Sequence, residues 1–154
     1  KEFNAEKKVY IIEANIDDSS PQVLAAFSEM AFKLGALDVF LTPVLMKKGR
    51  LATKLTVMAE IGKIDSLISA IFKETSSIGV RYFPVERRVL ERKIEKVGIL
   101  GEEVAIKISY QEGKEVNIQP EFSDCMRLAK KTDRSVKEII QLVLKEFYKK
   151  REKS

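Results

Sequence analysis

The sequence predicts an α+β protein that begins with a ferredoxin-like domain over residues 1–90 and continues into a small extension over residues 91–154. Two strand–helix–strand stretches follow one another in the first part, which is the βαββαβ order of the split βαβ, ferredoxin-like plan. Each predicted helix has one apolar stripe, as expected of a helix that covers one face of a sheet. After residue 90, short strands precede two helical stretches, which predicts a small β-then-α extension.

The first strand is predicted over residues 9–18, "VYIIEANIDD", because β-branched residues dominate it. Alternation places Tyr10, Ile12, Ala14 and Ile16 on one face, and Val9, Ile11, Glu13, Asn15 and Asp17 on the other. A helix follows, since Ser20 suits its N-cap, Pro21 its first position and Gly35 its end. Its predicted apolar stripe is Val23, Leu24, Phe27, Met30, Ala31 and Leu34.

Two more strands are predicted over residues 37–46 and 51–61, on either side of the segment "KKGR". Pro43 marks the first of them as an edge strand or a bend. The next helix, over residues 63–76, presents the stripe Ile64, Leu67, Ile68, Ile71 and Phe72. Residues 78–99 read as one long strand or a pair of strands, with a bend at Pro84.

The extension is predicted to contain strands separated by "LGEE" and by "QEGK", the second being a short hairpin turn at Gly113. A short helix capped by Ser123 follows. In the longer helix after it, Ser135 and Glu138 have the spacing of a capping box. The stripe of this helix is Val136, Ile139, Ile140, Val143, Leu144 and Phe147.

Composition excludes several classes of chemistry. The chain has no histidine, so it holds no Ser-His-Asp triad and no histidine-based metal site. Its one cysteine, Cys125, excludes an internal disulfide, fits a reducing, cytoplasmic setting and is expected to be a buried structural residue. A net charge of +5 suits anionic ligands or a solvated basic surface, and no apolar run reaches membrane-spanning length. Because the chain opens on Lys1 and a polar stretch, we expect it to be part of a longer polypeptide.

The motif "NIDD" is a candidate cation site. Glu13 and Asp17 share a strand face and Asp18 follows at the strand end. Carboxylate oxygens are the ligands that Mg²⁺ and Mn²⁺ prefer, most of all when the ion already carries phosphates. The alternative is that Asp17 and Asp18 turn the chain into the helix at Ser20, which leaves Glu13 unexplained.

The segment "KKGR" is a candidate phosphate site. A glycine permits a tight turn, and Lys47, Lys48 and Arg50 would then project together. An oligophosphate would relieve their mutual repulsion. A solvated hairpin turn with protective lysines is the alternative.

Arginines are dense in the predicted strand region that follows the second helix. Arg81, Arg87 and Arg88 each offer a planar fork that suits phosphate or carboxylate. Pairing with Glu86 and Glu91 on an exposed strand is the alternative.

Nucleic-acid binding is weakly supported. The two final helices have the order of a helix-turn-helix, but base-reading Asn or Gln side chains are scarce at the start of the second helix. The βαββαβ order is shared with RNA recognition motifs, yet "KGRLATKLTV" lacks the aromatic residues on which bases stack. We therefore expect no nucleic-acid partner, and no membrane partner.

Four stretches resemble the C-terminal half of the LarC family of nickel-pincer cofactor biosynthesis proteins. They are "NIDD" followed by "SPQ", "GALDVFLTPVLMKKGR", "ETSSIGVRYFPVERRVL" and "QPEFSDCMRLAKKT", which occur in order through most of the chain. The family pattern has proline-glycine after "KKGR", whereas Leu51 and Ala52 stand here. The local shape of the turn is therefore expected to differ.

The resemblance implies a CTP-dependent enzyme that inserts Ni²⁺, as substrate, into pyridinium-3,5-bisthiocarboxylic acid mononucleotide, and that assembles as a homo-oligomer. It implies that this chain binds CTP with Mg²⁺ or Mn²⁺, and that without the amino-terminal half it does not complete metal transfer. Lys47, Lys48 and Arg50, with Arg81, Arg87 or Arg88, would face the triphosphate, and Asp17, with Asp18 or Glu13, would hold the cation. A ligand-binding regulatory module of ferredoxin-like fold is the alternative function.

Overall fold

The computed structural model describes residues 8–152 and divides the chain into two compact units between Arg88 and Val89. Each unit has a hydrophobic core of its own. The first unit contains an antiparallel sheet of four strands in the order β2-β3-β1-β4, and the second contains one of three strands in the order β5-β6-β7.

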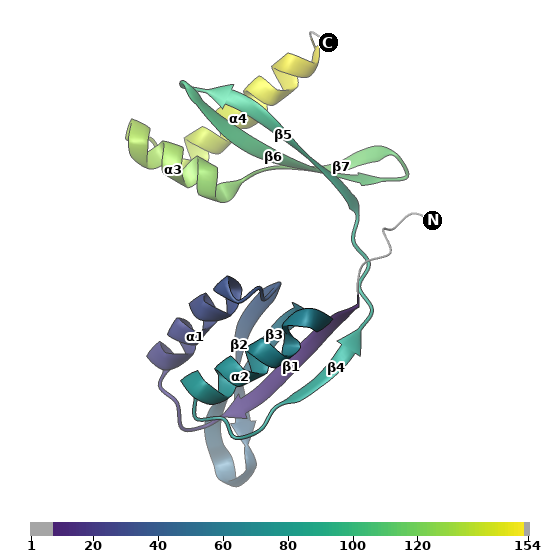
Figure 1. The fold of residues 1–154 in the computed structure, drawn as a ribbon. Helices are drawn as coiled ribbons and strands as arrows, with labels where there is room; N and C mark the ends of the chain where they lie inside the picture. Colours follow the sequence, from purple (N-terminus) through teal and green to yellow (C-terminus); the bar gives the residue numbers. More distant parts are fainter. Residues whose placement is uncertain (1–7, 153–154) are drawn as a thin grey trace. The chain divides into compact units, whose positions relative to one another are not determined.

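The first unit has the predicted ferredoxin-like fold. Its elements are β1 (Val9–Ile16), α1 (Pro21–Lys33), β2 (Asp38–Met46), β3 (Arg50–Glu60), α2 (Ile64–Glu74) and β4 (Arg81–Val85), with short 3₁₀ turns at Lys47–Gly49 and Ile61–Lys63. Both helices lie on one face of the sheet, and the β2–β3 hairpin extends past the end of β1 (Figure 1). Among residues 8–88, no helix lies on the other face of this sheet.

Alternation along β1 predicts its two faces correctly. Ile12, Ala14 and Ile16 are buried in the core under the helices. Each helix also buries most of its predicted stripe, but Val23 is 41% exposed and Phe72 is 45% exposed, contrary to expectation. Consecutive helix residues point about 100° apart. Their neighbours Leu24 and Ile71, which the same stripes include, are buried as predicted.

The predicted helix cap, helix end and edge strand of the first unit are confirmed. Ser20 caps α1, since its hydroxyl accepts a hydrogen bond from the amide of Val23 at 3.3 Å, and Pro21 is the first helical residue. Gly35 follows the helix with a φ of 99°, a conformation that other residues rarely adopt. Pro43 lies on the edge strand β2, where a proline is tolerated because the strand has a single neighbour.

The second unit is a three-stranded meander packed against two helices. Its elements are β5 (Glu91–Ile99), β6 (Glu102–Gln111), β7 (Lys114–Pro120), α3 (Phe122–Thr132) and α4 (Val136–Glu152). The hairpins close at Leu100–Gly101 and Glu112–Gly113, where all four residues have positive φ. Two such residues in a two-residue loop match the right-handed twist of the strands.

One predicted cap in this unit is wrong and the other is confirmed. Helix α3 begins at Phe122, so Ser123 lies inside the helix and does not cap it. The Asp124 carboxylate instead accepts a hydrogen bond from the amide of Ala105 at 3.0 Å, which ties α3 to β6. At α4 the capping box is present: the Glu138 amide donates to the Ser135 hydroxyl at 3.2 Å and the Ser135 amide donates to the Glu138 carboxylate at 3.1 Å.

Arg151 joins the end of α4 to the sheet. Its guanidinium donates to the Glu115 carboxylate on β7 and to Glu95 on β5, and it lies 4.3 Å from the centroid of the Phe147 ring. The hydrogen bond from Arg151 lowers the pKa of Glu115 below its ordinary value. These contacts fix the last turn of α4, where a helix would otherwise fray.

A carboxylate with a lowered folded-state pKa contributes stability above its unfolded pKa, and this is lost as the pH falls through the folded value. We therefore expect the melting temperature to fall as the pH drops below the ordinary glutamate pKa of about 4.3. The fall should be smaller in the Glu115→Gln variant, measured by scanning calorimetry from pH 7 to pH 3. Glu112→Gln, in the neighbouring turn, should behave like the unaltered chain. Identical pH profiles for all three proteins would contradict the assignment.

Candidate functional site

The candidate site is a hollow of about 410 Å³ in the first unit, between the end of β1 and the loop from α2 to β4. The antiparallel ladder of β1 and β4 runs from Val9–Val85 to Glu13–Arg81. Beyond this last pair the two segments diverge and the hollow opens between them. It is lined by Asn15, Ile16, Asp17, Asp18, Ser76, Ser77, Ile78 and Gly79.

Carboxylates and hydroxyls meet in this hollow. The Ser76 hydroxyl donates to the Asp18 carboxylate, and the Ser76 amide donates to the Ser19 hydroxyl at 3.2 Å. The Ser77 hydroxyl donates to the carbonyl of Gly79 at 2.8 Å. The sequence interpretation missed these serines, although the run "ETSSIG" between a helix and a strand is a signal that could have found them.

An ion pair joins the hollow to the β2–β3 hairpin. A guanidinium nitrogen of Arg50 lies 3.2 Å from the Asp17 carboxylate. Lys47 and Lys48 lie in the exposed turn of the same hairpin, and Lys48 has left-handed backbone angles, φ 62° and ψ 23°. The two predicted clusters, "NIDD" and "KKGR", are thus brought together through Arg50 and Asp17.

Glu13 is placed differently from Asp17 and Asp18. It lies on the helix-free face of the sheet and does not line the hollow. Its carboxylate accepts a hydrogen bond from Arg81 at 2.9 Å and pairs with Lys54 at 3.3 Å. The structure therefore brings Arg81 beside the hollow, through Glu13 and Asn15, and adds Lys54, which the sequence interpretation did not single out.

Arg87 and Arg88 are not brought to the hollow. They follow Val85, which pairs with Val9 at the opposite end of β1 from Asp17. The eight residues of β1 separate these ends by about 23 Å at 3.3 Å per residue. Of Arg81, Arg87 and Arg88, it is Arg81 that adjoins Glu13 and Asn15 in the described part of the chain.

The metal-binding capacity of the hollow is limited. Residues 8–152 contain no group of three or more His, Cys, Asp or Glu side chains placed to hold a metal ion together. Asp17 and Asp18 could supply two oxygens, and Mg²⁺ commonly completes such a set with waters and ligand phosphates. The hollow therefore suits a cation that arrives already chelated by an oligophosphate.

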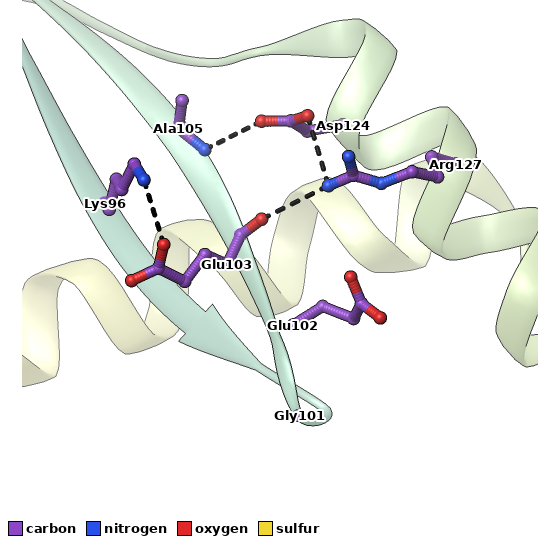
Figure 2. Close-up of a pocket in the computed structure, with 7 residues that line it drawn as sticks. All are labelled: Lys96, Gly101, Glu102, Glu103, Ala105, Asp124 and Arg127. Carbon is purple, nitrogen blue, oxygen red and sulfur yellow. Dashed lines mark hydrogen bonds and ion pairs between the residues drawn. The ribbon is translucent and has the colours of Figure 1, made fainter.

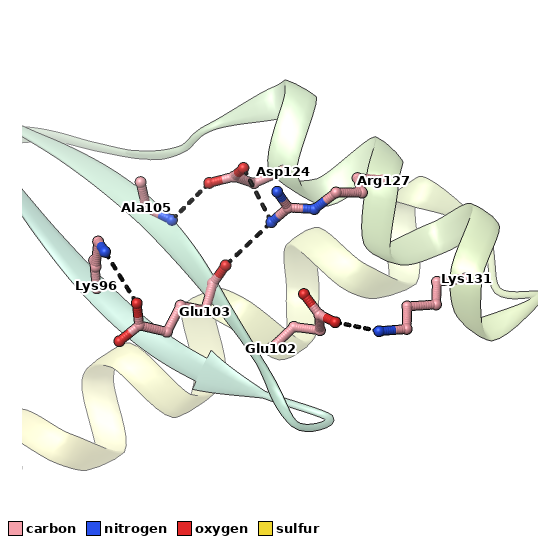
Figure 3. Close-up of polar contacts among 7 residues, drawn as sticks. All are labelled: Lys96, Glu102, Glu103, Ala105, Asp124, Arg127 and Lys131. Carbon is pink, nitrogen blue, oxygen red and sulfur yellow. Dashed lines mark hydrogen bonds and ion pairs between the residues drawn. The ribbon is translucent and has the colours of Figure 1, made fainter.

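A second hollow, of about 420 Å³, lies in the second unit between the β5–β6 hairpin and α3 (Figure 2). Its charged residues pair with one another or with Lys131: Lys96 with Glu103, Arg127 with Asp124, and Lys131 with Glu102 (Figure 3). The Lys131 ammonium lowers the pKa of Glu102 below its ordinary value. Because the charges compensate one another, this hollow presents no net charge to a ligand and we regard its contacts as structural.

Comparison with known proteins identifies relatives that match most of the chain. Residues 1–140 match the family model described as nickel insertion protein. The pyridinium-3,5-bisthiocarboxylic acid mononucleotide nickel insertion protein of Clostridium acetobutylicum is 39% identical over 140 residues, which are 91% of this chain and 33% of that protein. The protein of the same description from Thermotoga petrophila is 36% identical over 89% of this chain and 34% of its own length. The chain thus spans about a third of the length of these relatives.

One solved structure resembles the chain closely. It is LarC2, the C-terminal domain of a cyclometallase involved in the synthesis of the NPN cofactor of lactate racemase, in its apo form. The TM-score is 0.83 with 35% sequence identity, and the match covers 92% of this chain and 97% of that one. A Methanopyrus kandleri protein with a TM-score of 0.64 and 22% identity shares the fold. No helix in residues 8–152 is long and apolar enough to cross a bilayer.

Two glycines of the site should differ in their tolerance of a side chain. Gly49 has a φ of 70°, so Gly49→Ala should lower the free energy of unfolding by about 1 kcal/mol. A Cβ at Gly79 would meet no atom within 4 Å and its φ is not positive, so Gly79→Ala should change stability by less than about 0.5 kcal/mol. Urea denaturation of both variants checks this. Equal losses would show that the hairpin turn or the hollow has another shape.

Proposed function

Because the chain belongs to the nickel insertion protein family, we propose that it is the nucleotide-binding part of a nickel insertase. It binds CTP with Mg²⁺ or Mn²⁺, while the longer protein inserts Ni²⁺ into the pyridinium-3,5-bisthiocarboxylic acid mononucleotide named for its relatives. The observation that carries this proposal is the ion pair of Arg50 with Asp17. It places a cationic hairpin against a hollow lined by carboxylates and hydroxyls.

In this proposal the acidic residues of the hollow bind the cation, and the hydroxyls and nearby lysines bind the phosphates. Asp17 and Asp18 supply oxygens to the divalent cation. The hydroxyls of Ser76 and Ser77, which donate to Asp18 and to the Gly79 carbonyl in the structure, turn from these acceptors to donate to phosphate oxygens. Lys47 and Lys48 neutralise the remaining negative charge from the adjacent hairpin, where both side chains are exposed and able to swing. Multiple charge-assisted contacts of this kind are the usual way in which proteins hold oligophosphates.

Arg50 couples the cation to the nucleotide. In the structure its guanidinium pairs with the Asp17 carboxylate, and 62% of the Arg50 side chain is exposed. A divalent cation that enters at Asp17 repels this guanidinium, which then turns to the phosphates that accompany the cation. The cation and the nucleotide therefore bind cooperatively. The cation releases Arg50 to the phosphates, and the phosphates offset the repulsion between the cation and Arg50.

The wider assembly belongs to the same proposal. We place the protein in the reducing cytoplasm as a homo-oligomer that acts on small molecules, with Cys125 buried in the core of the second unit and serving no redox role. Desolvation raises the pKa of the Cys125 thiol, which disfavours the reactive thiolate.

Calorimetric titration tests the nucleotide. We expect CTP to bind in the presence of Mn²⁺ and to bind much more weakly without it, and we expect ATP and duplex DNA to bind less tightly than CTP. Gly79→Ala, which the fold should tolerate, narrows the hollow and should weaken CTP binding. Equal affinity for all nucleotides would favour a regulatory module of broad specificity, and tight salt-sensitive DNA binding would refute the proposal.

Asp17→Asn tests the cation. Loss of one carboxylate ligand should raise the Mn²⁺ concentration required for half-maximal CTP binding about tenfold. The melting temperature should change little, since the Asp17–Arg50 pair is partly exposed and such pairs contribute little stability. Glu29→Gln, on an exposed position of α1, is the matched control. An unchanged Mn²⁺ requirement in the Asp17 variant would exclude Asp17 as a ligand.

A further inference from the structure

We propose that Glu13 is a positioning residue, which holds Arg81 and Lys54 side by side as a phosphate-binding subsite on the helix-free face of the first sheet. This deepens the proposed function and rests on it, because the subsite borders the same hollow through Asn15. The phosphate belongs either to the nucleotide or to the pyridinium mononucleotide substrate. Both carry this group, so the chemistry of recognition is shared.

The contacts of Glu13 define the subsite. One carboxylate oxygen lies 2.9 Å from Arg81, and the other lies 3.3 Å from Lys54 on the opposite neighbouring strand. The Glu13 side chain is 15% exposed, whereas that of Arg81 is 51% exposed and that of Lys54 is 32% exposed. One shielded carboxylate thus gathers two solvent-accessible cations and leaves one positive charge uncompensated. A phosphate bound by Arg81 and Lys54 would neutralise the remaining positive charge.

Asn15 adds a directed donor. Its side-chain oxygen accepts a hydrogen bond from Arg81 at 3.1 Å. Arginine only donates, so the amide oxygen must face Arg81 and the amide nitrogen must face elsewhere. Asn15 also lines the hollow, which makes it the link between the subsite and the proposed CTP position. Donors from Arg81, Lys54 and Asn15 suit an acceptor-only group such as phosphate.

A buried hydroxyl lies on the same face of the sheet as Glu13. Thr56 is 3% exposed, and its hydroxyl is without a hydrogen-bond partner among the residues that the structure describes. It pairs with Glu13 in the β1–β3 ladder, so both side chains lie on the helix-free face. Buried polar groups are normally satisfied, so this hydroxyl is an exception in the first sheet.

This role differs from the metal ligation expected of Glu13 from its sequence. Both carboxylate oxygens already contact cationic side chains, and a divalent ion would have to displace Arg81 and Lys54 together. Asp17 has one cationic partner, Arg50, and lies in the hollow. The cation is therefore assigned to Asp17 and Asp18, and the anion to the cations that Glu13 positions.

The test uses the 154-residue chain and two probes, CTP with Mn²⁺ and nicotinic acid mononucleotide, which is a pyridinium mononucleotide. We expect Lys54→Met to weaken binding of one probe about tenfold, as the loss of one charge-assisted contact predicts. Arg81→Lys keeps the charge but not the fork that Glu13 and Asn15 hold, and should weaken the same probe. Lys73→Met, at an exposed position of α2, is the control and should change neither affinity.

The outcomes separate the possibilities. A loss confined to CTP assigns the subsite to the nucleotide, and a loss confined to nicotinic acid mononucleotide assigns it to the substrate. If the unaltered chain binds nicotinic acid mononucleotide but not CTP, the proposed CTP function is overturned. The Lys54→Met and Arg81→Lys variants then still test the subsite with nicotinic acid mononucleotide. Unchanged affinities for both probes, or no binding of either, overturn the subsite itself.

Glu13→Gln separates positioning from metal ligation. In this variant the Mn²⁺ concentration required for half-maximal CTP binding, or for Mn²⁺ binding alone, should match that of the unaltered chain. A shift comparable to that of Asp17→Asn would make Glu13 a metal ligand and would overturn its positioning role.

Discussion

The candidate site depends on the point at which one hydrogen-bonded ladder stops. β1 and β4 pair as far as Glu13–Arg81, and the segments that continue them are bridged by side chains, including the Ser76–Asp18 hydrogen bond. Both segments are anchored nearby, since Ile16 and Ile71 are buried in the core. The hollow between them is polar and open, and buried core residues precede both of its walls in the chain.

Charge compensation is the second constraint on this unit. Cations gathered near a ligand site repel one another, and the structure offsets this with carboxylates that lie between them. Asp17 holds Arg50, and Glu13 holds both Arg81 and Lys54. These pairs are partly exposed and contribute little stability individually. Their effect is to keep cationic side chains at defined places beside the hollow, where an anionic ligand can reach them.

Local patterns predicted most of the fold. The cap at Ser20, the edge position of Pro43 and the capping box of α4 each depend on a few neighbouring residues, and all are confirmed. The prediction that Ser123 caps α3 was wrong, because the helix begins at Phe122. The Asp124 carboxylate, one position later, accepts a hydrogen bond from the amide of Ala105 on β6, a contact that the local sequence does not reveal. Val23 failed as a core residue because the helical period does not decide which of two adjacent apolar residues faces the sheet.

The sequence by itself determined the order of strands and helices and the kinds of chemistry available: oxygen ligands, cations around a glycine turn and no histidine. Tertiary structure alone decided which of these charges meet. Arg50 contacts Asp17, Glu13 contacts Arg81 and Lys54, and Arg87 lies beyond the opposite end of β1. The physical reason is strand register. Pairing across residues far apart in the chain sets which side chains are neighbours, and a local pattern carries no record of that pairing.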